Sequence, residues 1–130
     1  MNSQQKPGAV LFAKDIVRIA RFYAELVPMT ATLTQPDLIV LESAHFQLVV
    51  HPIPKQIAKS IKIASPPVRR TDVPAKLIFP VADIAEVRAR ASALGGELNP
   101  PAKEFEARGF RACDGHDPEG NVVQFRQSAL

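Results

Sequence analysis

The stretch GFRACDGHDPEGNVVQF, residues 109–125, indicates the fold more directly than any other part of the sequence. At its centre, Asp117-Pro118-Glu119-Gly120 is a strong turn sequence, because proline fixes φ, glycine tolerates positive φ and aspartate can accept nearby backbone N–H groups. Runs of strand length lie on both sides of this turn, at 109–113 and 121–126. We therefore predict two strands joined by a tight turn.

A strand and a helix precede this pair. Residues 75–82, AKLIFPVA, form an apolar run that is followed by Asp83. Apolar side chains then recur at helical spacing, at Ile84, Val87, Ala91 and Leu94. Gly95-Gly96 stops the pattern, which predicts a helix over 83–94. The segments that remain in this half are expected to be a short strand and a loop, at 97–99 and 100–107.

The first half of the chain shows the same order of patterns. An apolar run at 8–14 is followed by Asp15 and then by apolar residues at helical spacing, which predicts a helix over 15–26. Asp15 can cap this helix because its carboxylate accepts free N–H groups of the first turn. Arg21 and Glu25 form an i,i+4 pair on its polar side. Three strands are expected after the helix, at 30–34, 38–42 and 45–51.

The two halves align at a constant offset of 68 residues, which places Asp15 on Asp83. The same offset matches further helix positions, Ile16 with Ile84, Ile19 with Val87 and Leu26 with Leu94. This match favours duplication of one supersecondary unit, although two unrelated strand–Asp–helix units would look alike. Between the halves, residues 52–74 contain five of the twelve prolines and are interpreted as a connector. Within it, 57–63 fits either a turn of helix or an edge strand.

Composition and charge limit the classes of function. The chain has 130 residues, 46% hydrophobic and 22% charged, which suits one globular domain. A single cysteine, Cys113, excludes an internal disulfide and fits a reducing compartment, so we expect a cytoplasmic protein. No apolar run of about 18 residues and no signal-peptide pattern occurs, so no membrane partner is expected.

The net charge of +3 is concentrated in the connector, which holds five basic residues against Asp72. Surfaces that bind nucleic acids interleave basic residues with stacking aromatic side chains, and the connector has no aromatic residue. We therefore expect no nucleic-acid partner. A local anion-binding role of the connector stays open.

The C-terminal half, with its strand ending in PVADI, its helix closing on LGG and its DPEGN turn, resembles the vicinal-oxygen-chelate superfamily of glyoxalases, bleomycin-resistance proteins and extradiol dioxygenases. The opening LFAKDIVRIARFYAEL resembles that superfamily's first strand and helix. The resemblance implies an α+β fold of two tandem βαβββ modules, which form a cupped, mostly antiparallel eight-stranded sheet with helices outside. It implies one domain over 1–130, with module one at 8–51 and module two at 75–128. It also favours a homodimer, the commonest oligomer in general.

Members of this superfamily usually hold a divalent metal at four positions, two in each module. Carried over one at a time, these positions are Gly8, Gln47, Lys76 and Gln124 here. Glycine offers no donor, lysine places a cation where the metal would sit, and amides are weak ligands, whereas catalytic sites use imidazole, thiolate or carboxylate. We therefore predict no bound metal and no other cofactor. Bleomycin-resistance-type members likewise sequester a ligand without a metal.

The preferred hypothesis for function is a metal-free protein that binds a small anionic or carbonyl-bearing organic molecule in the sheet cleft. His45 would share a strand face with Gln47, since side chains alternate, and Arg111 has a planar fork suited to anions. The expected ligand-binding residues are therefore Gln47, Lys76, Gln124, His45 and Arg111.

Neither a substrate nor a catalytic residue follows from the sequence. One alternative is a metal-dependent lyase or isomerase with displaced ligands. Another is a homodimeric structural or regulatory protein without a ligand. Phe12 or Phe79 can supply an apolar wall to a pocket, but the sequence leaves open which face of its strand each takes.

Overall fold

The computed structural model describes residues 5–129. In chain order its elements are β1 (Gly8–Ala13), α1 (Ile16–Leu26), β2 (Thr30–Gln35), β3 (Leu38–Glu42), β4 (Gln47–Pro52), α2 (Lys55–Ala58), β5 (Leu77–Pro80), α3 (Ile84–Ala93), β6 (Glu97–Leu98), a 3-10 turn (Pro101–Lys103), β7 (Phe105–Ala107), β8 (Phe110–His116) and β9 (Val122–Ser128). They form two compact units, Met1–Lys62 and Ile63–Leu130. The division lies inside the predicted connector, so each unit carries one of the predicted modules.

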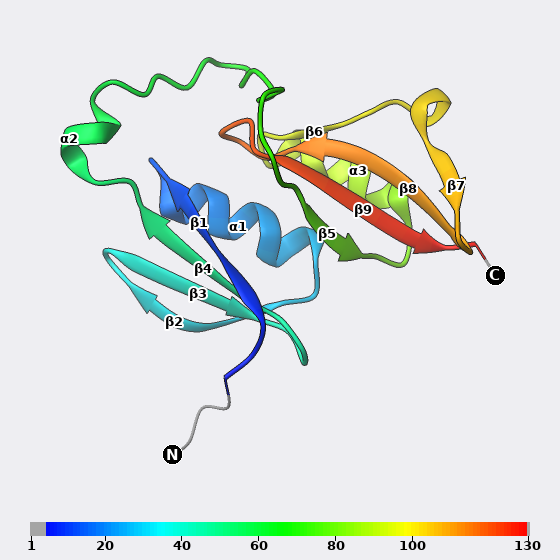
Figure 1. Cartoon of the computed structure of the whole chain (residues 1–130), viewed down its shortest axis with the longest axis horizontal. Coiled ribbons are helices and arrows are strands. Elements are labelled where there is room, and N and C mark those ends of the chain that lie inside the picture. The colour runs from blue at the N-terminus through cyan, green and yellow to red at the C-terminus, as the bar shows by residue number, and fades with distance from the viewer. Residues whose placement is uncertain (1–4, 130) are drawn as a thin grey trace. The chain divides into compact units, whose positions relative to one another are not determined.

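In the first unit, four strands form a sheet in the order β1-β4-β3-β2 (Figure 1). β1 pairs with β4 in parallel, and the other two pairings are antiparallel. α1 packs on one face of this sheet, with Ile19, Phe22 and Tyr23 buried. The strands contribute alternate residues to the same core, as their pleat requires: Ala13, Ile39, Leu41, Leu48 and Val50.

The second unit repeats this order. Its sheet runs β5-β9-β8-β6, with β5 parallel to β9, and β7 also pairs with β8. α3 contacts β6 and β9 and buries Ile84, Val87 and Ala91. In both units the first strand pairs with the last, and the last with the strand that precedes it in the chain. The predicted α+β class and the two βαβββ modules are thereby confirmed.

Both helices begin where the sequence indicates. The N–H of Arg18 donates to Asp15 Oδ1 at 3.1 Å, and the N–H of Ala85 donates to Asp83 Oδ1 at 3.0 Å. Such a cap stabilises a helix by roughly 1 kcal/mol. The predicted bounds differ from the observed ones by at most one residue at either end. The Arg21–Glu25 pair also forms, with Nε 2.6 Å from Oε2.

The DPEGN turn is held by Asp117, which is fully buried. Its Oδ1 accepts the N–H groups of Glu119 at 2.8 Å and Asn121 at 3.1 Å, and Asn121 Nδ2 donates to Oδ2 at 2.9 Å. Gly120 has φ +85°, and a Cβ there would lie 2.2 Å from the carbonyl oxygen of Val68. These contacts show that the residues of the DPEGN motif stabilise the turn itself.

Several strand predictions need correction. β4 begins at Gln47 instead of residue 45, because the N–H of Ser43 donates to Phe46 O at 3.0 Å and closes a tight turn before the strand. β8 extends to His116, since β6 pairs with its last two residues. The predicted loop at 100–107 contains β7, which pairs with β8. The described residues therefore form nine strands in two sheets, where eight strands in one sheet were expected.

The segment 57–63 is neither of the two expected elements as a whole, because α2 (Lys55–Ala58) includes only its first two residues and the others join no helix or strand. Among the described residues, no helix has the length and the apolar character needed to span a membrane.

Candidate functional site

Four polar side chains on the second sheet form a hydrogen-bonded chain, which we call the polar row: Lys76, Asp114, Gln124 and Arg126. Lys76 Nζ donates to Asp114 Oδ2 at 2.9 Å, and Gln124 Nε2 donates to Asp114 Oδ1 at 2.9 Å. Arg126 Nε donates to Gln124 Oε1 at 2.6 Å. The Asp114 carboxylate therefore accepts from both neighbours, and this fixes the Gln124 amide so that its oxygen faces Arg126.

Strand alternation places the polar row on the face away from α3. Gln124 of β9 is the cross-strand partner of both Asp114 in β8 and Ile78 in β5, so these three side chains share one face. The opposite face carries Gln127, whose Oε1 accepts the N–H of Ile84 at the start of α3 at 2.8 Å. Phe79 also points to the helix side and is 4% exposed. Phe79 is therefore a core residue, and it does not contribute an apolar surface to the face that carries the polar row.

Lys76 is accommodated in two ways. It precedes β5 directly, so its side chain remains 40% exposed, and its ammonium forms an ion pair with Asp114. A partly exposed pair of this kind stabilises the fold by at most about 1 kcal/mol. The ion pair matters more for ligand binding than for stability, because Asp114 already compensates the positive charge of Lys76.

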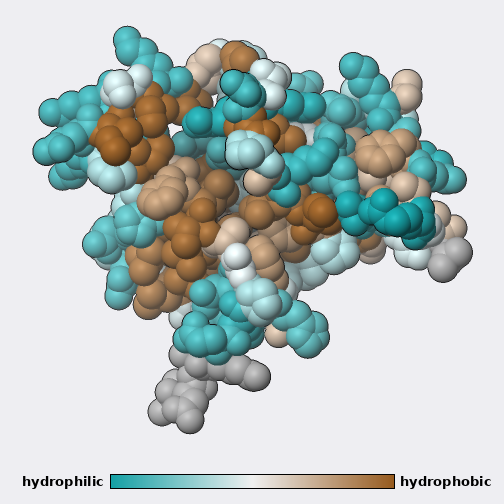
Figure 2. Space-filling view, in the orientation of Figure 1, coloured by the Kyte–Doolittle hydropathy of each residue, from teal (hydrophilic) through white to brown (hydrophobic). Residues whose placement is uncertain are grey.

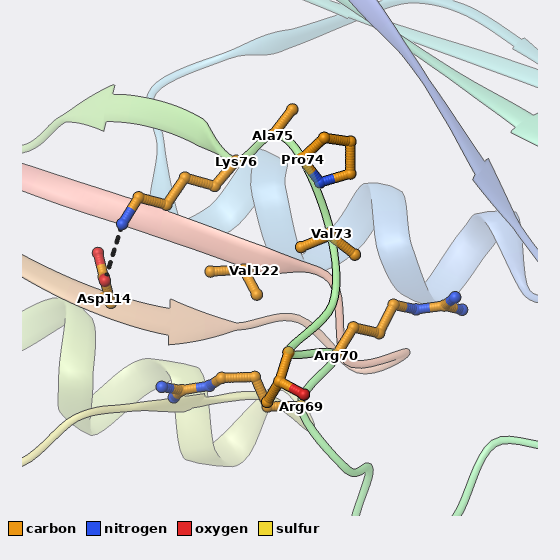
Figure 3. Close-up of a pocket in the computed structure, with 9 residues that line it drawn as sticks. Arg69, Arg70, Val73, Pro74, Ala75, Lys76, Asp114 and Val122 are labelled. Atoms are coloured by element: carbon orange, nitrogen blue, oxygen red, sulfur yellow. Dashed lines mark hydrogen bonds and ion pairs between the residues drawn. The ribbon is translucent and has the colours of Figure 1, made fainter.

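Beside this pair, the connector and the sheet enclose an open pocket of about 380 Å³. Most of its lining comes from the connector stretch 69–76, while Asp114 and Val122 belong to the sheet (Figure 3). Figure 3 shows Lys76 directed toward Asp114 and Arg70 extending away from them. The volume falls at the lower end of pockets that hold small organic molecules, roughly 300–1,000 Å³.

Hydrogen bonds hold the connector on the second unit. The N–H of Arg70 donates to Gly120 O at 2.9 Å. Arg69 donates from Nη1 to Asn99 Oδ1 at 2.7 Å and from Nε to His116 Nδ1 at 3.0 Å. The guanidinium of Arg69 therefore fixes the wall of the pocket.

His116, the acceptor of that last bond, is 5% exposed. Burial lowers the pKa of His116, the positive charge of Arg69 lowers it further, and Glu97 acts in the opposite direction. Only the neutral imidazole has a free Nδ1 to accept a hydrogen bond. The direction of the shift and the bond to Arg69 therefore favour the same neutral form.

In the first unit, Gln47 belongs to a separate polar group. Its cross-strand partner Glu42 pairs with Lys6 at 2.9 Å and accepts from Thr32 Oγ1 at 2.7 Å. The hydrogen bond from Lys6 lowers the pKa of Glu42, and Thr32 and Gln47 act in the same direction. His45 lies exposed in the turn before β4, so it does not share the strand face of Gln47.

The residues at the four superfamily metal positions do not fit a divalent cation. A Cβ on Gly8 would lie 2.0 Å from the carbonyl oxygen of Gln47, so this backbone leaves no room for a ligating side chain. The strand registers place Val49 instead of Gln47 at the last-strand position of the first module, because Val49 pairs with Val10 as Gln124 pairs with Ile78. Val49 offers no donor, and Lys76 is a cation.

The same requirement for clustered donors applies to the rest of the part of the chain that the structure describes. This part contains no cluster of three or more His, Cys, Asp or Glu side chains that could hold a metal ion.

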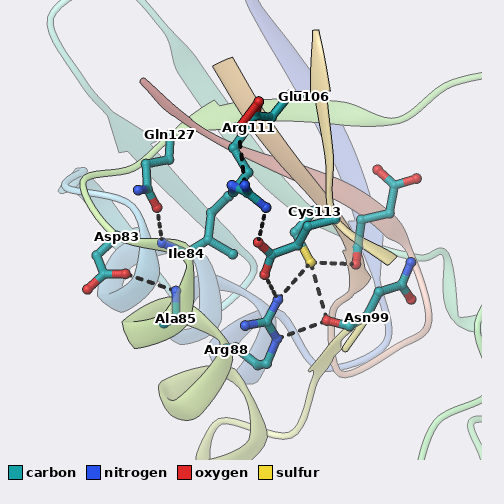
Figure 4. A network of polar contacts seen from close by, with 11 residues as sticks. Asp83, Ile84, Ala85, Arg88, Asn99, Glu106, Arg111, Cys113 and Gln127 are labelled. Atoms are coloured by element: carbon teal, nitrogen blue, oxygen red, sulfur yellow. Dashed lines mark hydrogen bonds and ion pairs between the residues drawn. The ribbon is translucent and has the colours of Figure 1, made fainter. Parts of the chain in front are cut away.

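Arg111 lies on the helix side of β8, away from the polar row (Figure 4). It pairs with Glu104 at 3.3 Å and Glu106 at 3.1 Å. The same network includes Arg88, which contacts Glu104 and lies 3.4 Å from the sulfur of Cys113. Burial raises the pKa of the Cys113 thiol, which suits a structural role. Of the residues expected to bind a ligand, the second unit brings together Lys76 and Gln124 and leaves Arg111 apart.

The corresponding positions of the first sheet are apolar, and Glu42 and Gln47 follow them on the same face, one cross-strand pair further along. Val10, Val49, Val40 and Leu33 are successive cross-strand partners, and we call them the apolar row. Phe12 lies on the same face, 52% exposed, with its ring centroid 5.3 Å from that of His51. Figure 2 shows hydrophobic surface gathered over the strands of this unit.

Sequence reasoning missed Asp114 and Arg126. A signal was present, because Asp114 is a carboxylate that directly follows the predicted strand at 109–113. Alternation along 121–126 also puts Arg126 on the side of Gln124. What the sequence could not give is the cross-strand register that joins these side chains.

Comparison with known families and structures is consistent with this architecture. A family model described as a glyoxalase-like domain matches residues 8–125. No curated protein sequence matches the chain.

Several solved structures share the fold. A glyoxalase/bleomycin resistance protein/dioxygenase family enzyme from Burkholderia phytofirmans is 18% identical, with a TM-score of 0.69 over 93% of this chain and 96% of that chain. A bleomycin-binding protein from Streptomyces verticillus, in complex with copper(II)-bleomycin, is 16% identical, with a TM-score of 0.58 over 98% and 99%. A fosfomycin resistance protein from Listeria monocytogenes is 16% identical, with a TM-score of 0.62 over 100% and 94%. At these identities the likeness concerns the fold alone.

Proposed function

Since the chain belongs to the glyoxalase-like domain family, we propose that it is a metal-free member that binds a small anionic or carbonyl-bearing organic molecule. The observation that carries this proposal is the occupant of a superfamily metal position in the second unit. There, Lys76 is ion-paired to Asp114, and Gln124 donates to the same carboxylate. Lys76 and Gln124 therefore occupy positions at which members of the superfamily hold a metal, and that metal attracts the oxygen atoms of a ligand.

The setting of this group supports binding. Asp114 and Lys76 line an open pocket of about 380 Å³, and its apolar lining includes Val73 and Val122. Small-molecule sites combine apolar walls with a few fixed polar groups. Charged hydrogen-bonding partners attract anions and polarised carbonyl groups in such a setting.

The bleomycin-binding protein offers an analogy, since its name describes a protein of this fold that binds an organic molecule. A lyase or isomerase with displaced metal ligands receives less support, because the described residues hold no cluster of metal donors outside the superfamily positions either.

Calorimetry at low salt tests the proposal. Protein purified without chelator would be titrated with a panel of small carboxylates and neutral carbonyl compounds. We expect saturable binding of at least one compound and no stoichiometric metal by elemental analysis. Lys76→Met should weaken binding about tenfold or more, because it removes a charged contact, worth about 1.5–3 kcal/mol, and leaves Asp114 unpaired.

The matched control is Lys55→Met, which removes the same charge from an exposed position on α2. Equal affinities of wild type and Lys76→Met would remove Lys76 from the site. A stoichiometric metal that is lost in Gln124→Ala would contradict the metal-free proposal.

A further inference from the structure

Arg126 differs from Lys76 in how its charge is compensated. Lys76 faces the carboxylate of Asp114, whereas Arg126 donates to the neutral amide oxygen of Gln124. Among the described residues, no carboxylate forms an ion pair with Arg126. The row therefore carries one uncompensated positive charge, and it lies at the Arg126 end.

The guanidinium of Arg126 is held in place before any ligand arrives. Its central carbon lies 4.2 Å from the centroid of the Phe110 ring, and Nε is fixed by Gln124. Stacking on an aromatic ring orients the plane of a guanidinium and leaves its edge open for hydrogen bonds. The two terminal nitrogens of Arg126 donate to no group in the described part of the chain, although the side chain is half-buried.

We propose that Arg126, which lies outside the lining of the pocket at the far end of the polar row, anchors a ligand that extends along this row, and that the group it binds is a carboxylate. A guanidinium fork matches the two oxygens of a carboxylate in a bidentate pair. This inference rests on the proposed function and specifies the chemical class of its ligand. Besides its own contact with the ligand, Lys76 compensates Asp114, so that this carboxylate does not repel the ligand.

Other cations of the second unit are less suited to this role. Arg69 is committed to Asn99 and His116, and Arg70 is exposed and extends away from Asp114. Arg108 stacks on the same Phe110 ring at 4.9 Å, but it is exposed and bonds to no member of the polar row. Arg108 is therefore a natural control for Arg126.

The test follows the Nε–H signals of arginine by NMR in the full chain, with benzoate as the probe and benzamide as its neutral counterpart. The signal of Arg126 is identified by its absence from Arg126→Gln. We expect benzoate to shift this signal saturably and benzamide to leave it in place. Arg126→Gln should weaken benzoate binding at least about tenfold, since hydrogen bonds to charged groups contribute about 1.5–3 kcal/mol.

Two further variants keep the result interpretable. Arg108→Gln removes the same charge beside the same ring and should change the affinity by less than about threefold. Arg126→Lys keeps the charge but not the fork, so it should bind benzoate more weakly than wild type even if Arg126→Gln fails to fold. Shifts confined to other arginines, equal binding of benzamide, or no saturable binding of benzoate would each overturn the inference.

The outcomes separate this inference from the function on which it rests. If benzoate binding is lost in Lys76→Met and kept in Arg126→Gln, the assignment of Arg126 as the anchor is wrong, and the proposed binding function is retained. If neither benzoate nor any compound of the wider panel binds, the binding function itself is wrong.

Discussion

The centre of the apolar row in the first unit, Val40 and Val49, occupies the positions that Asp114 and Gln124 of the polar row hold in the second. Val49 pairs with Val10 and Val40, as Gln124 pairs with Ile78 and Asp114. The two tandem modules therefore share strand order and register but not the chemistry of their open faces. One face is a run of aliphatic side chains, and the other is a chain of hydrogen bonds that ends in a stacked guanidinium.

This difference shows which features of the repeat are structural. Both helices keep an aspartate cap, and both helix-side faces supply the buried apolar side chains, because each unit must bury its own core. The open faces are under no such requirement, so each can carry an ion pair, Lys6 with Glu42 in the first unit and Lys76 with Asp114 in the second. At the counterparts of Asp114 and Gln124, however, the first unit has Val40 and Val49.

The largest loss of unfolding free energy is expected when a carboxylate of the polar row is introduced at its counterpart in the first unit. Val40 is the counterpart of Asp114, is 9% exposed and lies between Leu33 and Val49. Val40→Asp would bury a carboxylate without a partner, which costs about 3–5 kcal/mol. Urea denaturation at neutral pH measures the loss of unfolding free energy.

The same substitution at the outer end of the row provides the control. Leu33 is 38% exposed on an edge strand, so Leu33→Asp should cost less than about 1 kcal/mol. Equal losses for the two variants would mean that the apolar row is not a buried feature of the first unit.

The reverse substitution, an apolar side chain in place of a polar one in the second unit, should reduce the unfolding free energy by less. Asp114→Val leaves Lys76 and the Gln124 amide without their acceptor, which costs about 1–3 kcal/mol. The triple variant Lys76→Met/Asp114→Val/Gln124→Val removes the ammonium and the amide that lost their acceptor and should recover part of that loss, since only the Nε of Arg126 then lacks a partner. A triple variant less stable than Asp114→Val would show that the polar row itself stabilises the fold.

The smallest effect concerns pH and the connector. The pKa of His116 is lowered, chiefly by burial and next by Arg69, so the unfolded chain takes up a proton before the folded one does as pH falls. The contribution of His116 to stability is complete above its ordinary pKa of 6.5 and decreases below it, toward the folded pKa. His116→Gln retains an acceptor for Arg69 and should flatten this dependence between about pH 5 and 7.5.

Unfolding free energies at several pH values provide the measurement, with His45→Gln as the exposed control. If the unfolding free energy of His116→Gln changes with pH as that of the wild type does, the pH dependence belongs to other groups.

Much of the fold could be predicted because its signals are local. Asp15 and Asp83 mark the helix starts, Asp117 with Gly120 marks the turn, and the 68-residue offset marks the duplication. β7 was missed because the short segment Phe105–Ala107 has no clear alternation and becomes a strand only by pairing with β8. His45 was misplaced for a similar reason, since the turn that precedes β4 depends on a single backbone hydrogen bond.

The candidate site was predictable only in part. Lys76 and Gln124 were found by their places relative to Asp83 and the DPEGN turn, and both contact Asp114. Their partners Asp114 and Arg126 were missed, because sequence spacing does not show which residues of different strands lie opposite each other. Arg111 was included for its charge, yet strand alternation directs it to the helix side.

By itself, the sequence determined the α+β class, the two modules, the helix caps and the turn, because backbone conformation follows from residue types that are close along the chain. The tertiary structure alone decided that the Lys76 ammonium is compensated by Asp114 and that Arg126 keeps an uncompensated charge. The physical reason is that an ion pair depends on distance in space, and in this sheet the register of β5, β9 and β8 sets that distance.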